Sequence, residues 1–138
     1  MSFVIDNSVA LAWCFEDQQT EPIMELLDRV VAEGAVAPQL WPLEALNGLL
    51  TAERRGRIDA DVRRRMTASL RDLPIEIDVE TTNHVWTTTA RLAEIYQLTA
   101  YDSAYLELAL RRGLPLASGD QALIIAARAS HVSLLTTM

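Results

Sequence analysis

Short apolar runs that alternate with longer amphipathic stretches constrain the fold of this 138-residue chain more than any other feature. The runs are rich in β-formers and are too short for helices. The candidate strands are Phe3–Ile5, Ala35–Ala37, Ile75–Val79, Leu114–Ala117 and Val132–Leu135. Strands that alternate with helices predict βαβ units around a parallel sheet, which makes this an α/β chain with three α/β/α layers.

The helical stretches carry their own start and stop signals. In Glu21–Glu33 the apolar residues recur at helical spacing, Pro22 stands near the start, and Gly34 follows the end. Ser8 is a candidate cap for a first helix, and Asp59 for a later one. The other predicted helices span about Trp41–Arg55, Thr82–Tyr96, Asp102–Arg112 and Gln121–Ala129.

Length and composition predict one domain over residues 1–138 that is large enough to bury a core. No window approaches the roughly 18 consecutive apolar residues of a membrane span, and the N-terminus lacks a basic region typical of a signal peptide. The single Cys14 cannot form an internal disulfide, which fits a reducing compartment. We therefore expect a cytoplasmic protein that has no membrane partner.

All 12 basic residues are arginine, and the chain contains no lysine. A P-loop NTPase needs a phosphate-binding lysine, and a pyridoxal-phosphate enzyme needs a lysine for its Schiff base. The sequence excludes both classes.

The net charge of −7 is unevenly distributed along the chain. Residues 54–71 hold seven arginines against two aspartates, which gives +5 there and leaves −12 for the rest. A solvated helix face explains this run simply. The alternative is a surface that binds phosphates or an acidic partner.

Four acidic residues occupy positions where α/β proteins usually keep their chemistry. Asp6 and Asp120 follow candidate strands, while Glu44 and Asp102 fall in the first turns of candidate helices. Sites in open parallel sheets form beyond the carboxyl ends of the strands, so we expect these four side chains to converge. Carboxylates are the ligands that Mg²⁺ and Mn²⁺ prefer, and such ions can activate water and stabilise charge on a phosphate.

Taken singly, three of these acids have simpler explanations. Asp102 and Asp120 could each be a helix N-cap, and Glu44 could complement a helix dipole. Asp6 directly follows a core strand and is the hardest of the four to explain without a site. Because a carboxylate among apolar neighbours is costly to desolvate, a shared cation explains all four together.

Four segments in this order resemble the motifs of PIN-domain nucleases, and the resemblance covers nearly the whole chain. The segments are Asp6-Asn7-Ser8, Glu44 with Asn47, Tyr101-Asp102-Ser103-Ala104-Tyr105, and Leu116-Ala117-Ser118-Gly119-Asp120 with Leu123. In length the chain is similar to the VapC toxins of type II toxin–antitoxin pairs. Asn7 and Ser103 stand where other small residues are common in the family.

This resemblance implies a PIN-like fold and endoribonuclease activity that depends on Mg²⁺ or Mn²⁺. It implies RNA as the substrate, a small VapB-type antitoxin as partner, and a homodimer. Asp6, Glu44, Asp102 and Asp120 would be the catalytic, metal-binding acids. Ser118 would contribute a hydroxyl to catalysis, and Asn47 would support the site.

Two other functions stay open. Aspartate-dependent phosphotransferases also place an Asp after the first strand, but they want a second Asp two residues later, where this chain has Ser8, and usually a lysine. A PIN-like fold could also serve for binding alone, without turnover.

The remaining polar and aromatic candidates receive structural interpretations. His84 and His131 lack metal-ligand spacing. Trp13, Trp41 and Trp86 lie in apolar patterns, and we assign them to the core or to a dimer interface. Glu107 lies about one turn beyond Asp102 and could approach the site, but we do not assign it there.

Overall fold

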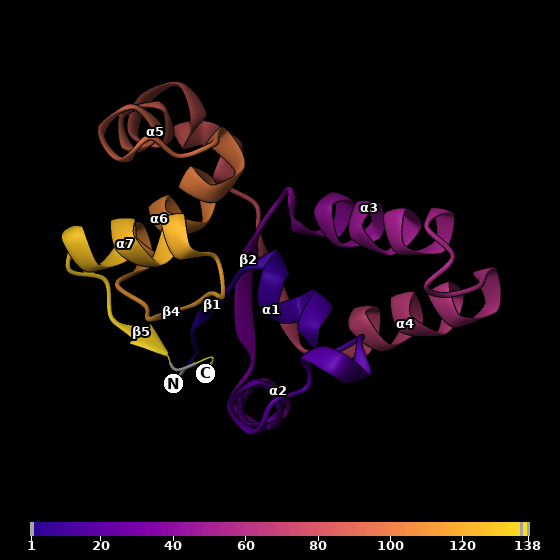
Figure 1. Ribbon diagram of the computed structural model, residues 1–138. Coiled ribbons are helices and arrows are strands. Elements are labelled where there is room, and N and C mark those ends of the chain that lie inside the picture. Colours follow the sequence, from indigo (N-terminus) through magenta and orange to yellow (C-terminus); the bar gives the residue numbers. More distant parts are fainter. Residues whose placement is uncertain (1, 136, 138) are drawn as a thin grey trace.

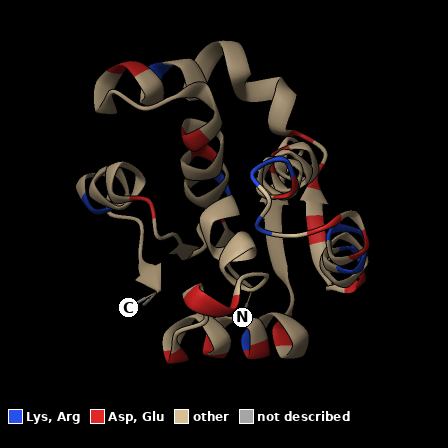
Figure 2. Cartoon of the chain, turned by 45° about the vertical axis from the view of Figure 1, so that its right-hand side comes forward, with Lys and Arg blue, Asp and Glu red and all other residues tan. Residues whose placement is uncertain are grey.

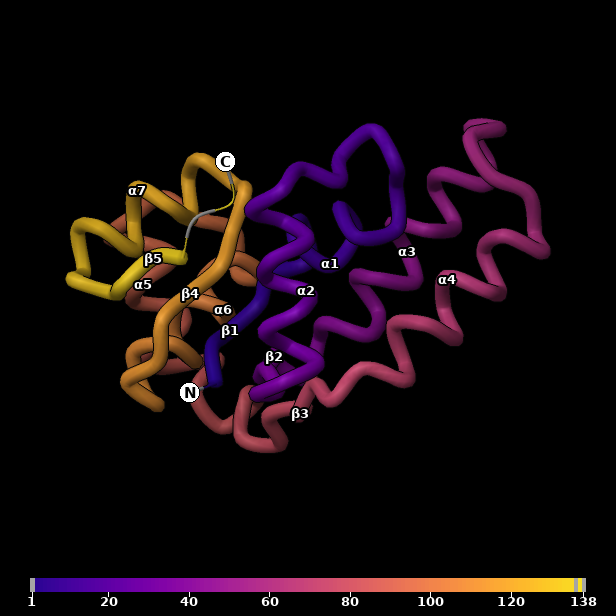
Figure 3. Tube along the Cα trace, turned by 90° about the horizontal axis from the view of Figure 1, so that it is seen from below, coloured from indigo at the N-terminus to yellow at the C-terminus, as the bar shows by residue number. Residues whose placement is uncertain are grey.

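A computed structural model describes residues 2–135 and 137 of the chain. Its centre is a five-stranded sheet in the order β3-β2-β1-β4-β5, in which every pair of neighbours is parallel. The strands are β1 (Val4–Ile5), β2 (Ala35–Pro38), β3 (Ile75–Asp78), β4 (Leu116–Ala117) and β5 (Leu134–Leu135). They lie side by side from β5 to β3 when the molecule is seen from below (Figure 3). All five strands were predicted from the sequence.

The order of the strands creates a switch point between β1 and β4. The chain moves from β1 to β2 and β3 on one side, and β4 and β5 then fill the other side. Loops that leave adjacent strands in opposite directions open a crevice at the carboxyl edge of the sheet. Any site built there draws on the residues that follow β1 and β4.

Seven α-helices are described in residues 2–135 and 137, and they surround the sheet (Figure 1). Their bounds are α1 (Asn7–Ala12), α2 (Glu21–Glu33), α3 (Trp41–Arg54), α4 (Ala60–Asp72), α5 (Ala90–Tyr96), α6 (Ala100–Arg112) and α7 (Gln121–Ala129). The side chain of Thr20 caps α2, and Gly34 ends it with a φ of 79°. That backbone angle favours glycine, which explains why the helix ends before Gly34, as the sequence predicted.

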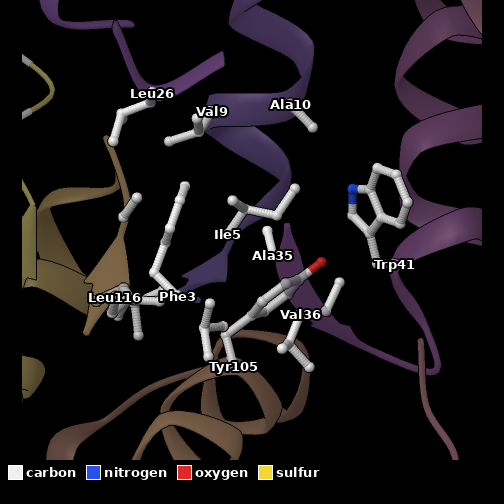
Figure 4. Packing of buried hydrophobic residues seen from close by; sticks show 14 of the residues in the cluster. Phe3, Ile5, Val9, Ala10, Leu26, Ala35, Val36, Trp41, Tyr105 and Leu116 are labelled. Atoms are coloured by element: carbon white, nitrogen blue, oxygen red, sulfur yellow. The ribbon is translucent and has the colours of Figure 1, made fainter. Parts of the chain in front are cut away.

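The helices pack on both faces of the sheet and give the expected three-layer α/β/α architecture. Val9 of α1 and Leu26 of α2 lie on one side of Phe3 and Ile5, and Tyr105 of α6 lies on the other (Figure 4). Helix α6 contacts β1, β2 and β4 and is buried from Ser103 to Ala109. Burial of both sheet faces explains why β1, β2 and β4 read as continuous apolar runs, whereas β3 at the edge of the sheet alternates apolar and acidic residues.

Two predictions about helix starts were wrong. Asp6, not Ser8, caps α1, because its side chain accepts a hydrogen bond from the backbone N–H of Val9. The stretch predicted as a helix over about Thr82–Tyr96 begins with a 3₁₀ turn, η2 (Thr81–His84), and a π-helical turn, η3 (Val85–Thr89), and becomes α-helical only at Ala90.

A network of ion pairs connects β3 with α6. Arg111 donates to Asp78 through Nη1 at 3.3 Å and to Glu107 through Nε at 2.7 Å. Arg112 donates to Glu76 at 2.6 Å. Glu107 is therefore occupied as a structural partner of Arg111 and does not extend toward the acidic residues near Asp102.

Among the described residues, the structure contains no helix with the length and apolar character needed to cross a membrane.

Candidate active site

The register of the sheet brings Asp6 and Ser118 together. Ile5 of β1 pairs with Ala117 of β4, so the residue that follows each strand stands at the same level of the sheet edge. The backbone N–H of Asp6 donates to the Ala117 carbonyl at 3.1 Å, and the Ser118 hydroxyl donates to Asp6 Oδ2. Both side chains are almost fully buried. The short strands thus position a carboxylate and a hydroxyl at the switch point.

Ser8 holds the other oxygen of Asp6 and links it to the loop after β4. Its hydroxyl donates to Asp6 Oδ1 at 2.6 Å and accepts from the backbone N–H of Gly119 at 2.9 Å. With the N–H of Val9, three donors hold the Asp6 carboxylate. These contacts fix the orientation of Asp6.

Asp120 lies two residues beyond Ser118 at the start of α7. Its backbone N–H donates to the Ser118 hydroxyl at 3.0 Å, and its Oδ1 accepts from the N–H of Leu123 at 3.1 Å. Asp120 is therefore the N-cap of α7, as its isolated position suggested. One of its carboxylate oxygens has this capping role, and the side chain still lies close enough to Asp6 and Asp102 to repel both.

Glu44 projects from the first turn of α3 toward α6. Its Oε1 accepts a hydrogen bond of 2.7 Å from the hydroxyl of Tyr105. Figure 4 shows the Tyr105 ring beside Val36, with its oxygen directed toward the side on which Trp41 of α3 lies. Burial and the Glu44 carboxylate raise the pKa of Tyr105 far above its ordinary value, so it is a neutral donor. The sequence motif contained Tyr105, but its contact with Glu44 was not predicted.

Asp102 is half-buried in the first turn of α6 and does not cap that helix. The cap is Thr99, whose hydroxyl accepts from the Asp102 backbone N–H at 3.1 Å. The sequence allowed either Asp102 or Asp120 to be a helix N-cap. Asp120 caps α7, whereas the Asp102 carboxylate has no capping role.

Desolvation and mutual repulsion raise the pKa of three of the acids. For Asp6, burial is the largest cause of the raised pKa, and repulsion from Asp120 raises the pKa further. The hydrogen bonds from Ser118, Ser8 and the Val9 N–H lower it, but by less. Burial and then repulsion from Asp120 and Asp6 raise the pKa of Asp102. Burial and Asp102 likewise raise the pKa of Glu44, although the Tyr105 hydrogen bond opposes the shift. Such shifts mark carboxylates that influence one another.

The four acids predicted from the sequence therefore form one electrostatically connected group at the carboxyl edge of the sheet. Within the described residues, no three or more His, Cys, Asp or Glu side chains are spaced to hold a metal ion as they stand. Asn47 is exposed on α3, and its side chain has no hydrogen bond to any of the residues that the structure describes. The buried Oδ1 of Asn7, next to Asp6, has no hydrogen-bond partner in the described part of the chain.

The arginines of residues 54–71 are divided between ion pairs and open surface. Arg63 pairs with Glu53, Arg64 with Asp61 at 3.1 Å, and Arg57 with Asp17 at 3.5 Å. Figure 2 shows blue basic and red acidic segments close together on α3 and α4. Three of the seven arginines of this run are thus engaged in ion pairs, and the role of the run stays open.

A parallel α/β domain with acidic residues at the switch point of its sheet has them where open α/β sheets bind their ligands. The family model described as PIN domain matches residues 3–129. The chain therefore belongs to the PIN domain family, whose members are generally nucleases. No match was found among curated proteins.

Solved structures share the fold at low sequence identity. PAE2754 from Pyrobaculum aerophilum is 22% identical, with a TM-score of 0.68, over 91% of this chain and 84% of that one. FitAcB from Neisseria gonorrhoeae is 16% identical, with a TM-score of 0.69, over 99% and 98% of the two chains. A structure of FitAB bound to an IR36 DNA fragment is 13% identical, with a TM-score of 0.68, over 99% and 95%.

Proposed function

We propose that this protein is a metal-dependent endoribonuclease and the VapC-like toxin of a toxin–antitoxin pair. The observation that carries the proposal is the buried Asp6, held by Ser8 and Ser118 beside two carboxylates that repel it and each other. Holding these carboxylates close together is costly, and a bound cation or a reaction that uses them would offset that cost. Membership of the PIN domain family supports the same function.

The donor set fits Mg²⁺ or Mn²⁺. All four candidate ligands are carboxylates, and hard divalent cations prefer oxygen donors. Mg²⁺ commonly retains several waters and binds one or two carboxylates directly, so it does not require the three-residue spacing that the described side chains lack. We assign Asp6 as the central ligand, Asp102 and Asp120 as further ligands, and Glu44 as a ligand or an acceptor for bound water.

The chain's own groups have distinct parts in phosphodiester hydrolysis. The bound ion would lower the pKa of a water and offset the charge of the scissile phosphate. In the hydrolysis a water oxygen would bond to phosphorus as the bond to the ribose oxygen breaks. The proton given up by that water would pass to a carboxylate such as Glu44, and the departing ribose oxygen would take up a proton from solvent. Ser8 and Ser118 keep Asp6 oriented, and Tyr105 keeps Glu44 oriented, by their hydrogen bonds. Positioning of this kind supplies much of enzymatic rate enhancement.

Replacing Asp6→Asn tests this function. The amide has the size of the carboxylate but lacks its charge, so cleavage of single-stranded RNA in Mg²⁺ or Mn²⁺ should fall by at least about 10²-fold. Chelation should abolish cleavage by the unmodified protein, and circular dichroism should show that the variant is folded. Unchanged cleavage by the purified variant, at a level that a mock purification does not reach, would contradict the proposal. A binding protein without turnover would cleave nothing under any of these conditions.

We also propose a small antitoxin as partner, a homodimer as the assembled state, and the cytoplasm as the place of action. The resemblance to VapC toxins supports the antitoxin, and a similar chain was solved in FitAB bound to a DNA fragment. Expression of this chain alone should arrest growth, and co-expression of a protein encoded beside it should relieve the arrest. Arrest that persists in the Asp6→Asn variant would separate toxicity from nuclease activity.

A further inference from the structure

A groove of about 320 Å³ extends away from the acidic site between α1 and α3. One wall begins at Ser8, the residue that donates to Asp6, and continues to Leu11 and Phe15. The other wall belongs to α3 and to the turn that follows it. The lining residues of this second wall are Gly48, Thr51, Ala52, Arg55 and Arg57.

The second wall lies on one face of α3, on a stripe of residues that begins at Glu44 and ends at Arg55. Glu44, Gly48, Thr51 and Arg55 are spaced at i, i+4, i+7 and i+11, which places them along a single stripe. Eleven residues at about 1.5 Å each separate Glu44 and Arg55 by roughly 16 Å along the helix. The groove lines the part of this stripe from Gly48 to Arg55. Its end at Ser8 and Gly48 adjoins the acidic site and is called the acidic end, and its end at Arg55 and Arg57 is called the basic end.

Gly48 lets the two walls approach each other. A Cβ built at this glycine would lie 2.5 Å from Leu11 Cδ1, so the α1 side chain fills the space that any larger residue would need. Leu11 and Gly48 both line the groove. A larger residue at position 48 would force Leu11 outward and narrow the path between the two ends.

The basic end presents two exposed arginines. The Arg57 guanidinium lies 4.4 Å from the centroid of the Phe15 ring, a cation–π contact that fixes its position. Its ion pair with Asp17, at 3.5 Å between two exposed side chains, is weak and can yield to a phosphate. Arg55 forms no ion pair within the described residues.

We propose that this groove holds a single strand of RNA, and that Arg55 and Arg57 bind a backbone phosphate away from the scissile one. The inference rests on the proposed nuclease function and names where its substrate lies. The acidic end repels phosphates until a cation is bound, so a strand needs a cationic anchor elsewhere. Thr51 and Gln18 also line the groove and offer it a hydroxyl and an amide.

A double variant, Arg55→Gln with Arg57→Gln, tests the groove. Anisotropy of a labelled 12-nucleotide RNA in chelator measures affinity at several salt concentrations. We expect affinity to fall on the order of tenfold, and the slope of log K against log salt to decrease by about 0.7 for each phosphate that the variant no longer neutralises. Arg64→Gln with Arg91→Gln removes the same charge from exposed positions outside the groove, and it should change affinity less than about twofold.

Kinetics separate this proposal from the nuclease function itself. With Mg²⁺ and a long single-stranded substrate, the double variant should raise KM and leave kcat unchanged, while a dinucleotide substrate should show no difference. If the two double variants lower RNA affinity equally, the groove is not the RNA site. The same conclusion follows if the Arg55→Gln, Arg57→Gln variant keeps its RNA affinity but binds an acidic protein segment more weakly. If the unmodified protein binds RNA through Arg55 and Arg57 but never cleaves it, the nuclease proposal is wrong and the proposal of an RNA-binding groove is still supported.

Discussion

At the scale of single residues, the site depends on polar side chains that hold carboxylates in place. Asp6 accepts three hydrogen bonds, and Glu44 accepts one from Tyr105. The acids themselves were predictable, because each one follows a strand or begins a helix. The Tyr105 contact was not, since it joins residues 61 positions apart and depends on how α6 lies across the sheet. A tyrosine on the same helix face as Asp102 was the only signal in the sequence.

Tyr105→Phe should therefore weaken the site while leaving the core intact. The ring remains in its buried position, but the Glu44 carboxylate loses its donor. Removing one hydrogen bond to a charged acceptor costs about 1.5–3 kcal/mol where water cannot replace it, and less at the half-buried Glu44. We expect a loss of about 1 kcal/mol in urea unfolding, together with a higher Mg²⁺ concentration for half-maximal cleavage.

Tyr96→Phe is the matched control, because this tyrosine is partly buried and packs against the core on α5. It should leave the metal requirement unchanged. If Tyr105→Phe shows the same metal requirement as the unmodified protein, Glu44 takes no part in holding the ion.

At the scale of helices and strands, the hydrophobic pattern predicted more than the caps did. All five strands and the bounds of α2 and α7 follow from local sequence, because short apolar runs and helix caps act over a few residues. The start of α1 did not follow, because Asp6 and Ser8 both suit an N-cap and only the sheet register decides between them. The π-helical turn η3 has no signal in the sequence that we can identify.

Between elements, Arg111 should be the most important ion-pairing residue. Its partners Asp78 and Glu107 are almost fully buried, at 1% and 3% side-chain exposure. Removing one member of a buried pair leaves its partner uncompensated and typically costs about 3–5 kcal/mol. Arg111→Ala should lower the free energy of unfolding at pH 7 by about that amount, measured in urea. Arg112→Ala should cost clearly less, because Arg111 still binds Asp78.

The pH dependence of the free energy of unfolding of Arg111→Ala tests whether the lost pairing with Asp78 causes the destabilisation. Burial alone would raise the pKa of Asp78, but hydrogen bonds from Arg111, Thr81 and the Glu80 N–H lower it to about 2. The stability that this carboxylate contributes is complete above its ordinary pKa of 3.8 and is lost as the pH falls toward 2. The difference between Arg111→Ala and the unmodified protein should therefore shrink over that window. A difference that stays constant from pH 5 to pH 2 would assign the destabilisation to packing instead.

At the scale of the whole molecule, several large apolar side chains are left exposed by the fold. Trp86 is 90% exposed on η3, and Tyr101 and Leu43 are also largely exposed at the starts of α6 and α3. The core takes up Trp13 and Trp41, as expected from the sequence, but leaves Trp86 outside. Aromatic side chains are enriched at protein interfaces, so we propose that Trp86 contacts another chain. The sequence could not separate the three tryptophans, because all three lie in apolar patterns.

Trp86→Glu should therefore dissociate the proposed homodimer. A buried carboxylate without a partner is costly at an interface, whereas in the monomer this position faces solvent and tolerates charge. Light scattering after size exclusion should show a shift from dimer to monomer at micromolar concentration, with unchanged thermal unfolding of the monomer. Ile125→Glu is the matched control, since Ile125 is 58% exposed on α7, an element far from η3 in sequence. If both variants remain dimeric, the copies meet elsewhere and Trp86 serves another contact; the antitoxin is then the first partner to test, by comparing its affinity for the two variants.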